Sequence, residues 1–481
     1  MKINRLSWFL LYVALATLMA QADRAPNLVL HGTLTRADHE TYRMLPFTVP
    51  SGVHRITVEF SYTGQEHHTT VDLGLFGPKG FRGWSGGNKS SFTVSANDAT
   101  PSYLKGSIIP GAWKIALGIP NIRADVRSEY TVNIFFDFSG QPDSNTAAFS
   151  PVVRKGQAWY RGDLHTHTGH SDGNCNSKSG KEVPCPVFKT LEAAAARKLD
   201  FIAVSDHNTV SHFNDLRELA PYFDNLLLLH AREITTFQGH ANVFGPDQFV
   251  DFRVSSVNVP DVNTMLHQVR DLGGIVSINH PDAPSGEDCM GCGWNPHPEA
   301  DLHLITAVEA VNGFHSEIDF WDKQLNRGYR LTGIGGSDSH DADNRPPEPS
   351  AVGTPTTVVY AKELSETAIL DGIRAGHVFI DLEGSSDRML SFRATAGTQA
   401  AGMGDLLHAS PGTEITFSVQ TVGVPNQKLE LIEDGKPLNN ETLATGAFSI
   451  RADDHRHWFR INVWSSKGKL LLVGNPIYLN F

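Results

Sequence analysis

Histidines and carboxylates are concentrated in the middle of the chain, at spacings that suit metal coordination. Of the 22 histidines, thirteen lie between residues 161 and 340. His165 and His167 are two residues apart in a segment predicted to be a strand, where side chains two apart point to the same side. Imidazole and carboxylate ligands together suit zinc, manganese or iron. The first expectation is therefore a divalent-metal site.

Further candidate ligands follow predicted strands in the same region. The strand predicted at 201–205 is followed directly by Asp206 and His207, and the strand predicted at 275–278 leads to His280. The other candidates lie at or beside predicted strands: Asp172, Glu233, His240, Asp338 and His340. Because functional residues of β/α barrels lie where strands end, these side chains are expected to converge at one mouth. Any one motif could be incidental, but five of them in order at strand ends are hard to explain by chance.

Three regions of the chain differ in pattern. Residues 156–384 alternate strand-like and helix-like runs, which is typical of parallel β/α units. Residues 23–155 and 385–481 instead show short strands with alternating polar and apolar side chains, separated by glycine- and proline-rich breaks. We therefore expect an α/β domain flanked by an N-terminal and a C-terminal β-sandwich.

Length and composition limit the class of protein. A chain of 481 residues with 40% hydrophobic and 19% charged residues is globular, with two to four domains expected. The net charge of -12 argues against a general basic surface for nucleic acid, and no sequence-specific nucleic-acid binding is expected. A small phosphorylated substrate remains compatible, because bound metal supplies local positive charge. The oligomeric state is not indicated.

Residues 1–22 have the pattern of a secretory signal peptide. Lys2 and Arg5 precede a nearly apolar run over residues 6–20, and a small-x-small cleavage site precedes Asp23. A membrane anchor is the alternative, although the run is short for a bilayer span. No later segment is long and apolar enough to span, so a periplasmic or secreted protein is expected.

Export also affects how the four cysteines are interpreted. An oxidising compartment favours disulfides, and of the three possible connectivities the local pairs Cys175–Cys185 and Cys289–Cys292 are preferred. A zinc site built from all four cysteines is the competing interpretation. The C-x9-C spacing does not fit the usual short zinc knuckles.

The motifs together resemble those of the PHP (polymerase and histidinol phosphatase) superfamily. The matching segments are His165-Thr-His167, Ser171-Asp172, Ser205-Asp-His207, Glu233 with Gly239-His240, His280-Pro281 and Asp338-Ser-His340. The match covers about residues 159–382. The two cysteine loops look like those of the exported branch that includes the CehA/McbA-like carbaryl hydrolases.

The resemblance implies a distorted (β/α)7 PHP barrel that holds two or three divalent ions (zinc, manganese or iron). It assigns the first ion to His165, His167, Glu233 and Asp338. It assigns the second ion to a bridging Glu233 with His240 and His280, and the third to Asp172, His207 and His340. Asp206 would lie behind the ligands and orient a ligating histidine.

Other residues near the motifs are weaker candidates. His170 and His315 could reach the substrate. Arg161 and Arg232 flank ligand motifs and could clamp a phosphate, although a salt bridge is favoured for each. Glu309 ends a strand and is either a further polar contact of the site or an acid at the rim of the barrel.

The resemblance and the ligand chemistry predict a PHP-type metal-dependent hydrolase acting on ester bonds through a metal-bridging hydroxide. Asp338 could also shuttle the proton, and His207 or His340 could protonate the leaving group if the third ion is absent. A small phosphoester is the favoured substrate. The alternatives are a carbamate or carboxylic ester, as the carbaryl-hydrolase branch suggests, and a metal-stabilised scaffold that binds glycans or surfaces.

Overall fold

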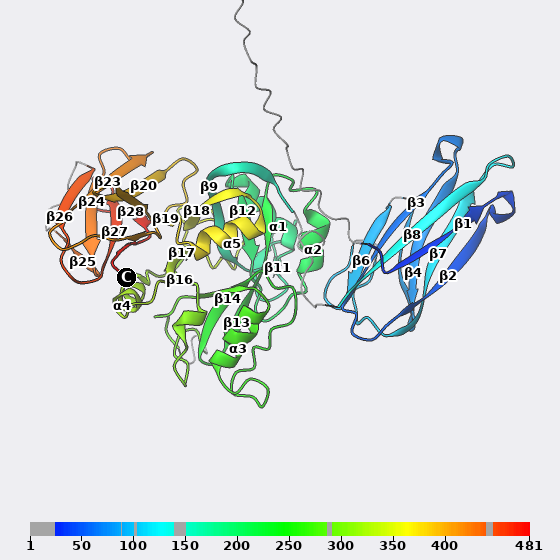
Figure 1. The fold of residues 1–481 in the computed structure, drawn as a ribbon, viewed down its shortest axis with the longest axis horizontal. Helices are drawn as coiled ribbons and strands as arrows, with labels where there is room; N and C mark the ends of the chain where they lie inside the picture. Colours follow the sequence, from blue (N-terminus) through cyan, green and yellow to red (C-terminus); the bar gives the residue numbers. More distant parts are fainter. Residues whose placement is uncertain (1–24, 88, 101–102, 139–150, 286–290, 439–445) are drawn as a thin grey trace, which may run out of the picture.

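The computed structural model describes residues 25–87, 89–100, 103–138, 151–285, 291–438 and 446–481. The signal peptide expected at 1–22 and the cysteine at 289 lie outside these residues. Three parts follow one another along the long axis: N-terminal strands, a mixed α/β part, and C-terminal strands (Figure 1). In the described part of the chain, no helix has both the length and the apolar character needed to cross a membrane.

The N-terminal part consists of two antiparallel four-stranded sheets, ordered β1-β8-β3-β6 and β2-β7-β4-β5. The strands are β1 (Leu28–Leu34), β2 (Thr41–Val49), β3 (Arg55–Tyr62), β4 (Thr70–Gly77), β5 (Gly80–Gly86), β6 (Ser91–Ser95), β7 (Gly111–Asn121) and β8 (Ser128–Asp137), with short turns at η1 (Arg36–Asp38) and η2 (Gln65–His67). Every second residue of β8 is buried, which gives the sheet one apolar face. Val132 from one sheet and Trp113 from the other belong to the same buried core.

The central part holds strands of a large mixed sheet, with helices packed against it. Its strands are β9 (Arg154–Thr166), β12 (Phe201–Val204), β13 (Leu227–Thr236), β14 (Gly239–Phe244), β15 (Ile275–Ile278), β16 (Ala307–Asn312) and β17 (Thr332–Gly336). Its helices are α1 (Val187–Ala196), α2 (Phe213–Leu219), α3 (Val262–Asp271), α4 (Ile318–Asn326) and α5 (Glu366–Arg374), with a short η3 (Leu302–Leu304) and a hairpin of β10 (Asn174–Asn176) and β11 (Glu182–Pro184). Side chains cap two of the helices: Asp261 accepts from Thr264 N (2.9 Å) before α3, and Ser365 accepts from Ala368 N (3.3 Å) before α5.

The described residues do not show the (β/α)7 barrel that the family resemblance implies. β9, β12 and β13 are parallel, as are β15, β16 and β17, but β14 runs antiparallel to both of its neighbours. The reason is local: Phe237 and Gln238 form a tight turn that leads from β13 straight back into β14, with no intervening helix. The segment that follows β17 nevertheless lies beside β9, as the hydrogen bond from Asp338 N to His165 O (2.8 Å) shows.

The C-terminal part continues the central sheet. β18 (Thr356–Leu364) pairs with β9, and β19 (Val378–Asp381) pairs with both β18 and β28 (Leu470–Gly474). The expected domain boundary between residues 384 and 385 thus separates strands that belong to one sheet. The remaining strands are β20 (Met389–Ala396), β21 (Gln399–Gly402), β22 (Leu406–Leu407), β23 (Glu414–Val422), β24 (Lys428–Glu433), β25 (Lys436–Pro437), β26 (Ala447–Arg451), β27 (His457–Trp464) and β29 (Ile477–Leu479). A second sheet, β21-β20-β23-β26, covers an apolar core that it shares with β27 and β28.

The N-terminal sheets attach to the central part through buried charges. Arg55 on β3 donates to Asp98 (3.0 Å) and to Asp247 (2.6 Å), and Arg217 on α2 forms a further ion pair with Asp98. Because these side chains are largely shielded from water, their pairing fixes α2 against the N-terminal part. The loop that leads into this helix from β12 carries Asp206 and His207.

Candidate metal centre

The strand ends bring one set of predicted ligands together in the interior, and we call this set the inner group. It comprises His165, His167, Glu233, His240, His280 and Asp338. His165 Nε2 lies 3.4 Å from Glu233 Oε1 and 3.3 Å from Asp338 Oδ1. His167 Nε2 lies 3.1 Å from the same Asp338 oxygen. These residues come from β9, β13 and the segment after β17, so the proximity of the strand ends positions them.

Glu233 is the centre of the inner group. Its Oε1 lies 3.3 Å from both His240 Nδ1 and His280 Nε2, whereas its Oε2 lies 3.6 Å from His167 Nε2. Asn279 Nδ2 donates to Oε1 at 2.9 Å and so fixes the carboxylate. The two oxygens therefore face different histidines, as a bridging carboxylate requires.

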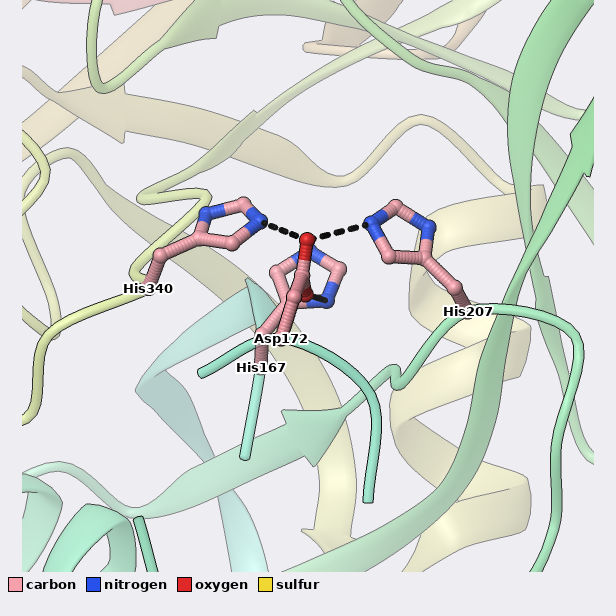
Figure 2. Close-up of side chains that lie close together, drawn as sticks. All are labelled: His167, Asp172, His207 and His340. Atoms are coloured by element: carbon pink, nitrogen blue, oxygen red, sulfur yellow. Dashed lines mark ion pairs between the residues drawn. The ribbon is translucent and has the colours of Figure 1, made fainter. Parts of the chain in front are cut away.

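Asp172, His207 and His340 form a second set nearer the surface, which we call the outer cluster. The His207 and His340 rings approach Asp172 from opposite sides, each with Nε2 at 3.4 Å from Oδ2, and His167 lies beneath them (Figure 2). His167 Nδ1 is 3.7 Å from Asp172 Oδ1, so this imidazole lies between the two sets. His207 Nδ1 also lies 2.8 Å from Glu233 Oε2. The two sets are thus contiguous.

Two inner residues adopt an uncommon backbone conformation. The φ angles of His280 and Asp338 are 26° and 53°, in the region that favours glycine. Such a conformation costs roughly 1–3 kcal/mol and persists only where the surroundings enforce it. Here Asp338 is held by its own N–H to His165 O and by Ser350 Oγ, which donates to Asp338 O at 2.7 Å. The strained backbone conformation at these two residues therefore orients their side chains toward the inner group.

Unpaired polar atoms in the interior show that a cation fits the inner group. Within the described residues, several buried atoms of the inner group have no hydrogen-bond partner: His165 Nε2, Glu233 Oε2, both ring nitrogens of His240 and His280 Nδ1. Burying such atoms without a partner costs about 1–3 kcal/mol each. Since His165, His167 and Glu233 offer ligand atoms within 4.8 Å of one another, as do His207, Glu233 and His240, divalent ions would satisfy many of these atoms.

The charges of the centre are mutually dependent. Burial lowers the pKa of His165, but the carboxylates of Asp338 and Glu233 outweigh it and hold that pKa well above its usual value. Burial dominates at His167 and lowers its pKa to about 4. Burial opposes a charge on His207, yet Glu233 raises its pKa to about 10. Cations bound here would displace protons that the carboxylates otherwise hold on His165 and His207.

Asp206 lies behind the turn that leads to Asp172. Its carboxylate accepts hydrogen bonds from Thr168 N (2.8 Å), Thr168 Oγ1 (2.6 Å) and Ser171 Oγ (2.6 Å), and it lies 3.4 Å from His212 Nδ1. These contacts fix the turn that leads to Asp172. Ser171 Oγ also lies 3.5 Å from His167 Nδ1, so Asp206 reaches a proposed ligand through this hydroxyl, and its role in orienting that histidine stays a prediction.

The two arginines for which a salt bridge was favoured over a phosphate clamp are engaged in structural contacts. Arg161 forms an ion pair with Asp381 (2.7 Å) and donates to Arg388 O (2.8 Å). Arg232 donates to Gln248 O (2.6 Å) and to Pro246 O, and it packs over the Phe213 ring. Both guanidinium groups are buried, and the structure brings neither into the inner group or the outer cluster.

The two histidines proposed to reach substrate differ in their surroundings. His170 Nε2 pairs with Asp215 (3.0 Å) and its Nδ1 lies 2.6 Å from Ser211 Oγ, so α2 and the residues before it hold the ring. His315 is exposed in the loop that follows β16, and its carbonyl accepts from Asn312 N.

The cysteine predictions are confirmed for one pair. Cys175 and Cys185 form a disulfide in the loop next to Asp172, which rules out a zinc site built from four free thiolates. The predicted partner of Cys292 lies outside the described residues, so the second pairing stays a prediction.

Three residues that support the site were not predicted: Asn279, Asn312 and Ser350. Asn279 fixes Glu233, Asn312 Nδ2 lies 3.4 Å from Asp338 Oδ2, and Ser350 binds the Asp338 carbonyl. Asn279 directly precedes the His280-Pro281 motif and Asn312 ends β16. Their positions at strand ends could therefore have identified these two asparagines from the sequence.

Comparison with known proteins gives only distant similarity. No family model and no curated protein matches the chain. A solved two-domain protein of Bacteroides vulgatus, described as containing a predicted PHP-like metal-dependent phosphoesterase, is 18% identical over 67% of this chain and 95% of that chain, with a TM-score of 0.36. A putative metal-dependent phosphoesterase of Bifidobacterium adolescentis is 15% identical over 44% of this chain and 95% of that chain, with a TM-score of 0.30. These TM-scores are too low to establish a shared fold, so the side-chain geometry carries the functional argument.

Proposed function

We propose that this protein is an exported PHP-type metal-dependent hydrolase that cleaves small phosphoesters. The position of Glu233 carries this proposal: its two oxygens face histidines of the inner group on one side and His207 of the outer cluster on the other. A buried carboxylate shared in this way suits two or three neighbouring ions of zinc, manganese or iron. Adjacent ions are well suited to a phosphoryl group, whose oxygens carry the charge that must be neutralised.

Bound divalent ions would supply Lewis acidity, which lowers the pKa of water and polarises a phosphoryl oxygen. The protein's own residues supply position and proton transfer. His165, His167, Glu233 and Asp338 are the proposed ligands of the first ion; Glu233, His240 and His280 of the second; and Asp172, His207 and His340 of the third. Asp338 is the proposed proton acceptor. If the third ion is absent, His207 or His340, at the solvent-facing side, would protonate the leaving-group oxygen.

The finer assignments belong to the same proposal. The run β9, β12 to β17 would be a distorted form of the seven-stranded PHP barrel in which the β13–β14 turn replaces one helix. The flanking sheets would be domains of residues 23–155 and 385–481, the second joined to the central sheet where β28 pairs with β19. The leader at 1–22 would direct export to the periplasm or the medium.

A carbamate or carboxylic ester is the second candidate substrate. The Cys175–Cys185 disulfide favours it, because the resemblance to the carbaryl-hydrolase branch rests on the cysteine loops and this pair is formed beside Asp172. Such a substrate needs two ions rather than three, so the outer cluster would then contribute binding rather than a third ion.

Hydrolysis of matched esters tests these candidates. The purified chain, reconstituted with Mn²⁺ or Zn²⁺, would be assayed on nitrophenyl or naphthyl phosphate, phosphodiester and methylcarbamate. We expect phosphoester turnover that falls about 1,000-fold in Asp338→Asn, since the ions contribute several kcal/mol and 1.36 kcal/mol is tenfold. Asp224→Asn, an exposed change, is the matched control. Carbamate turnover alone would favour the second candidate, and no turnover with ions bound would favour a binding scaffold.

A further inference from the structure

Glu309 is a buried carboxylate behind the inner group, on β16. Its Oε1 lies 3.0 Å from His165 Nδ1, and its Oε2 accepts from His280 N (3.1 Å) and from Asn312 Nδ2 (3.0 Å). The same Asn312 nitrogen lies 3.4 Å from Asp338 Oδ2. One carboxylate thus contacts residues assigned to both inner ions.

The geometry separates Glu309 from the ligands themselves. Glu233 and Asp338 lie near His165 Nε2, whereas Glu309 lies near Nδ1, on the other edge of the ring. Both Glu309 oxygens are engaged by nitrogens, whereas His165 Nε2 is buried and without a hydrogen-bond partner among the described residues. An imidazole that donates from Nδ1 to a carboxylate keeps the lone pair of Nε2 free for a cation.

A glycine on β17 makes this contact possible. A Cβ at Gly336 would lie 2.2 Å from Glu309 Oε1 and 2.6 Å from His165 Cβ, closer than atoms can approach. Any larger residue would therefore push the carboxylate away from the ring. The neighbouring strand leaves the space in which Glu309 and His165 meet.

We propose that Glu309 is a positioning residue of the inner group: it fixes the His165 ring with Nε2 directed at the first ion, reaches Asp338 through Asn312, and through His280 N aligns these ligands with one assigned to the second ion. The inference depends on the proposed function only in that the inner group binds divalent ions. It holds whichever ester is cleaved. It also decides between the two roles open to Glu309, because this acid faces the ligands and not the rim.

Glu309→Gln is the sharpest test, because the amide keeps the shape but replaces one oxygen by a donor. In either orientation, an NH2 group faces His165 Nδ1–H or the two donors at Oε2. The His165 proton can relieve the first conflict only by moving to Nε2, where it blocks the ion. Glu317→Gln is the matched control: Glu317 is also buried, but the hydrogen bond recorded at its carboxylate comes from Asp282 N (3.1 Å) and not from a proposed ligand.

The measurement is metal affinity and stoichiometry of the full chain, by equilibrium dialysis with Zn²⁺ or Mn²⁺, with the visible spectrum of the Co²⁺ form and circular dichroism. We expect Glu309→Gln to stay folded, to bind an inner ion about 10- to 100-fold more weakly and to alter the Co²⁺ spectrum, with no change in Glu317→Gln. If Glu309→Gln fails to fold, Asn312→Ala takes its place, with a smaller loss of affinity expected.

Each outcome decides a separate question. Unchanged affinity and spectrum in the folded Glu309 variant, or in Asn312→Ala where that variant is used, would overturn the positioning role and leave the proposed hydrolase intact. A wild-type chain that binds ions without hydrolysing any ester would overturn the proposed function and leave the positioning role intact. A wild-type chain that binds no divalent ion would overturn both.

Discussion

The inner group and the outer cluster use the same residue types, but they differ in exposure to solvent. The side chains of His165 and Glu233 are 0% and 1% exposed, whereas those of Asp172 and His340 are 54% and 36% exposed. Without a cation, water can solvate the outer residues, but it cannot reach the inner atoms that lack partners. The inner group therefore gains more from binding an ion, and we expect its ions to be held more tightly.

The two sets also differ in what holds them. The inner residues lie on strands or soon after them. Asn279 and Ser350 donate hydrogen bonds that fix them, and the β9 backbone accepts one from Asp338 N. The outer cluster depends on loops: Gly169 N donates to Cys185 O (2.7 Å), and Asn174 N donates to His340 O (2.6 Å). We therefore expect mutations in these loops and changes of solvent to alter the outer cluster without altering the inner group.

Glu233→Gln should have the largest effect, because Glu233 faces histidines of every proposed site. The amide cannot bridge two cations, and its NH2 group would oppose His165 or His207. We expect both inner ions to be lost and hydrolysis to fall by about 1,000-fold or more, measured by elemental analysis and by turnover. Retention of two ions per chain would refute the central position of this carboxylate. Asp224→Asn again serves as the control.

Graded removal of metal should separate the two sets in the wild-type chain. Because the outer cluster is open to solvent, a mild chelator should remove one ion at a concentration that leaves the inner ions bound. The measurement is metal content per chain after dialysis against increasing chelator. A single step in which all ions leave together would contradict the distinction between the two sets.

His340→Ala should have an intermediate effect that is confined to the outer cluster. Its ring lies opposite His207 across Asp172, so its removal should cost the outer ion but not the inner ions. We expect hydrolysis of phosphoesters to fall about 10- to 100-fold, since the remaining ions still activate water. Loss of every ion in this variant would mean that the sets cannot be separated.

The sequence predicted which side chains lie together better than it predicted the sheet. The strands at 201–205 and 275–278 are present as Phe201–Val204 and Ile275–Ile278, and the residues after them meet because strand ends lie together. The antiparallel direction of β14 was missed, since a buried strand has the same apolar pattern in either direction. The pairing of Phe379 with Gly474 was missed because no local pattern reports a contact so distant in sequence.

Removal of the Cys175–Cys185 disulfide should have the smallest effect on catalysis, and this effect should be confined to the outer cluster. The bond closes a short loop beside Asp172, and Asn174, directly before this loop, donates its N–H to His340 O. Replacing both cysteines by serine should lower the free energy of unfolding by about 2–3 kcal/mol, measured by thermal denaturation. Affinity for the outer ion should fall severalfold, while affinity for the inner ions stays unchanged. An equal loss at the inner group would show that the strands alone do not fix it, and that the loop supports both sets.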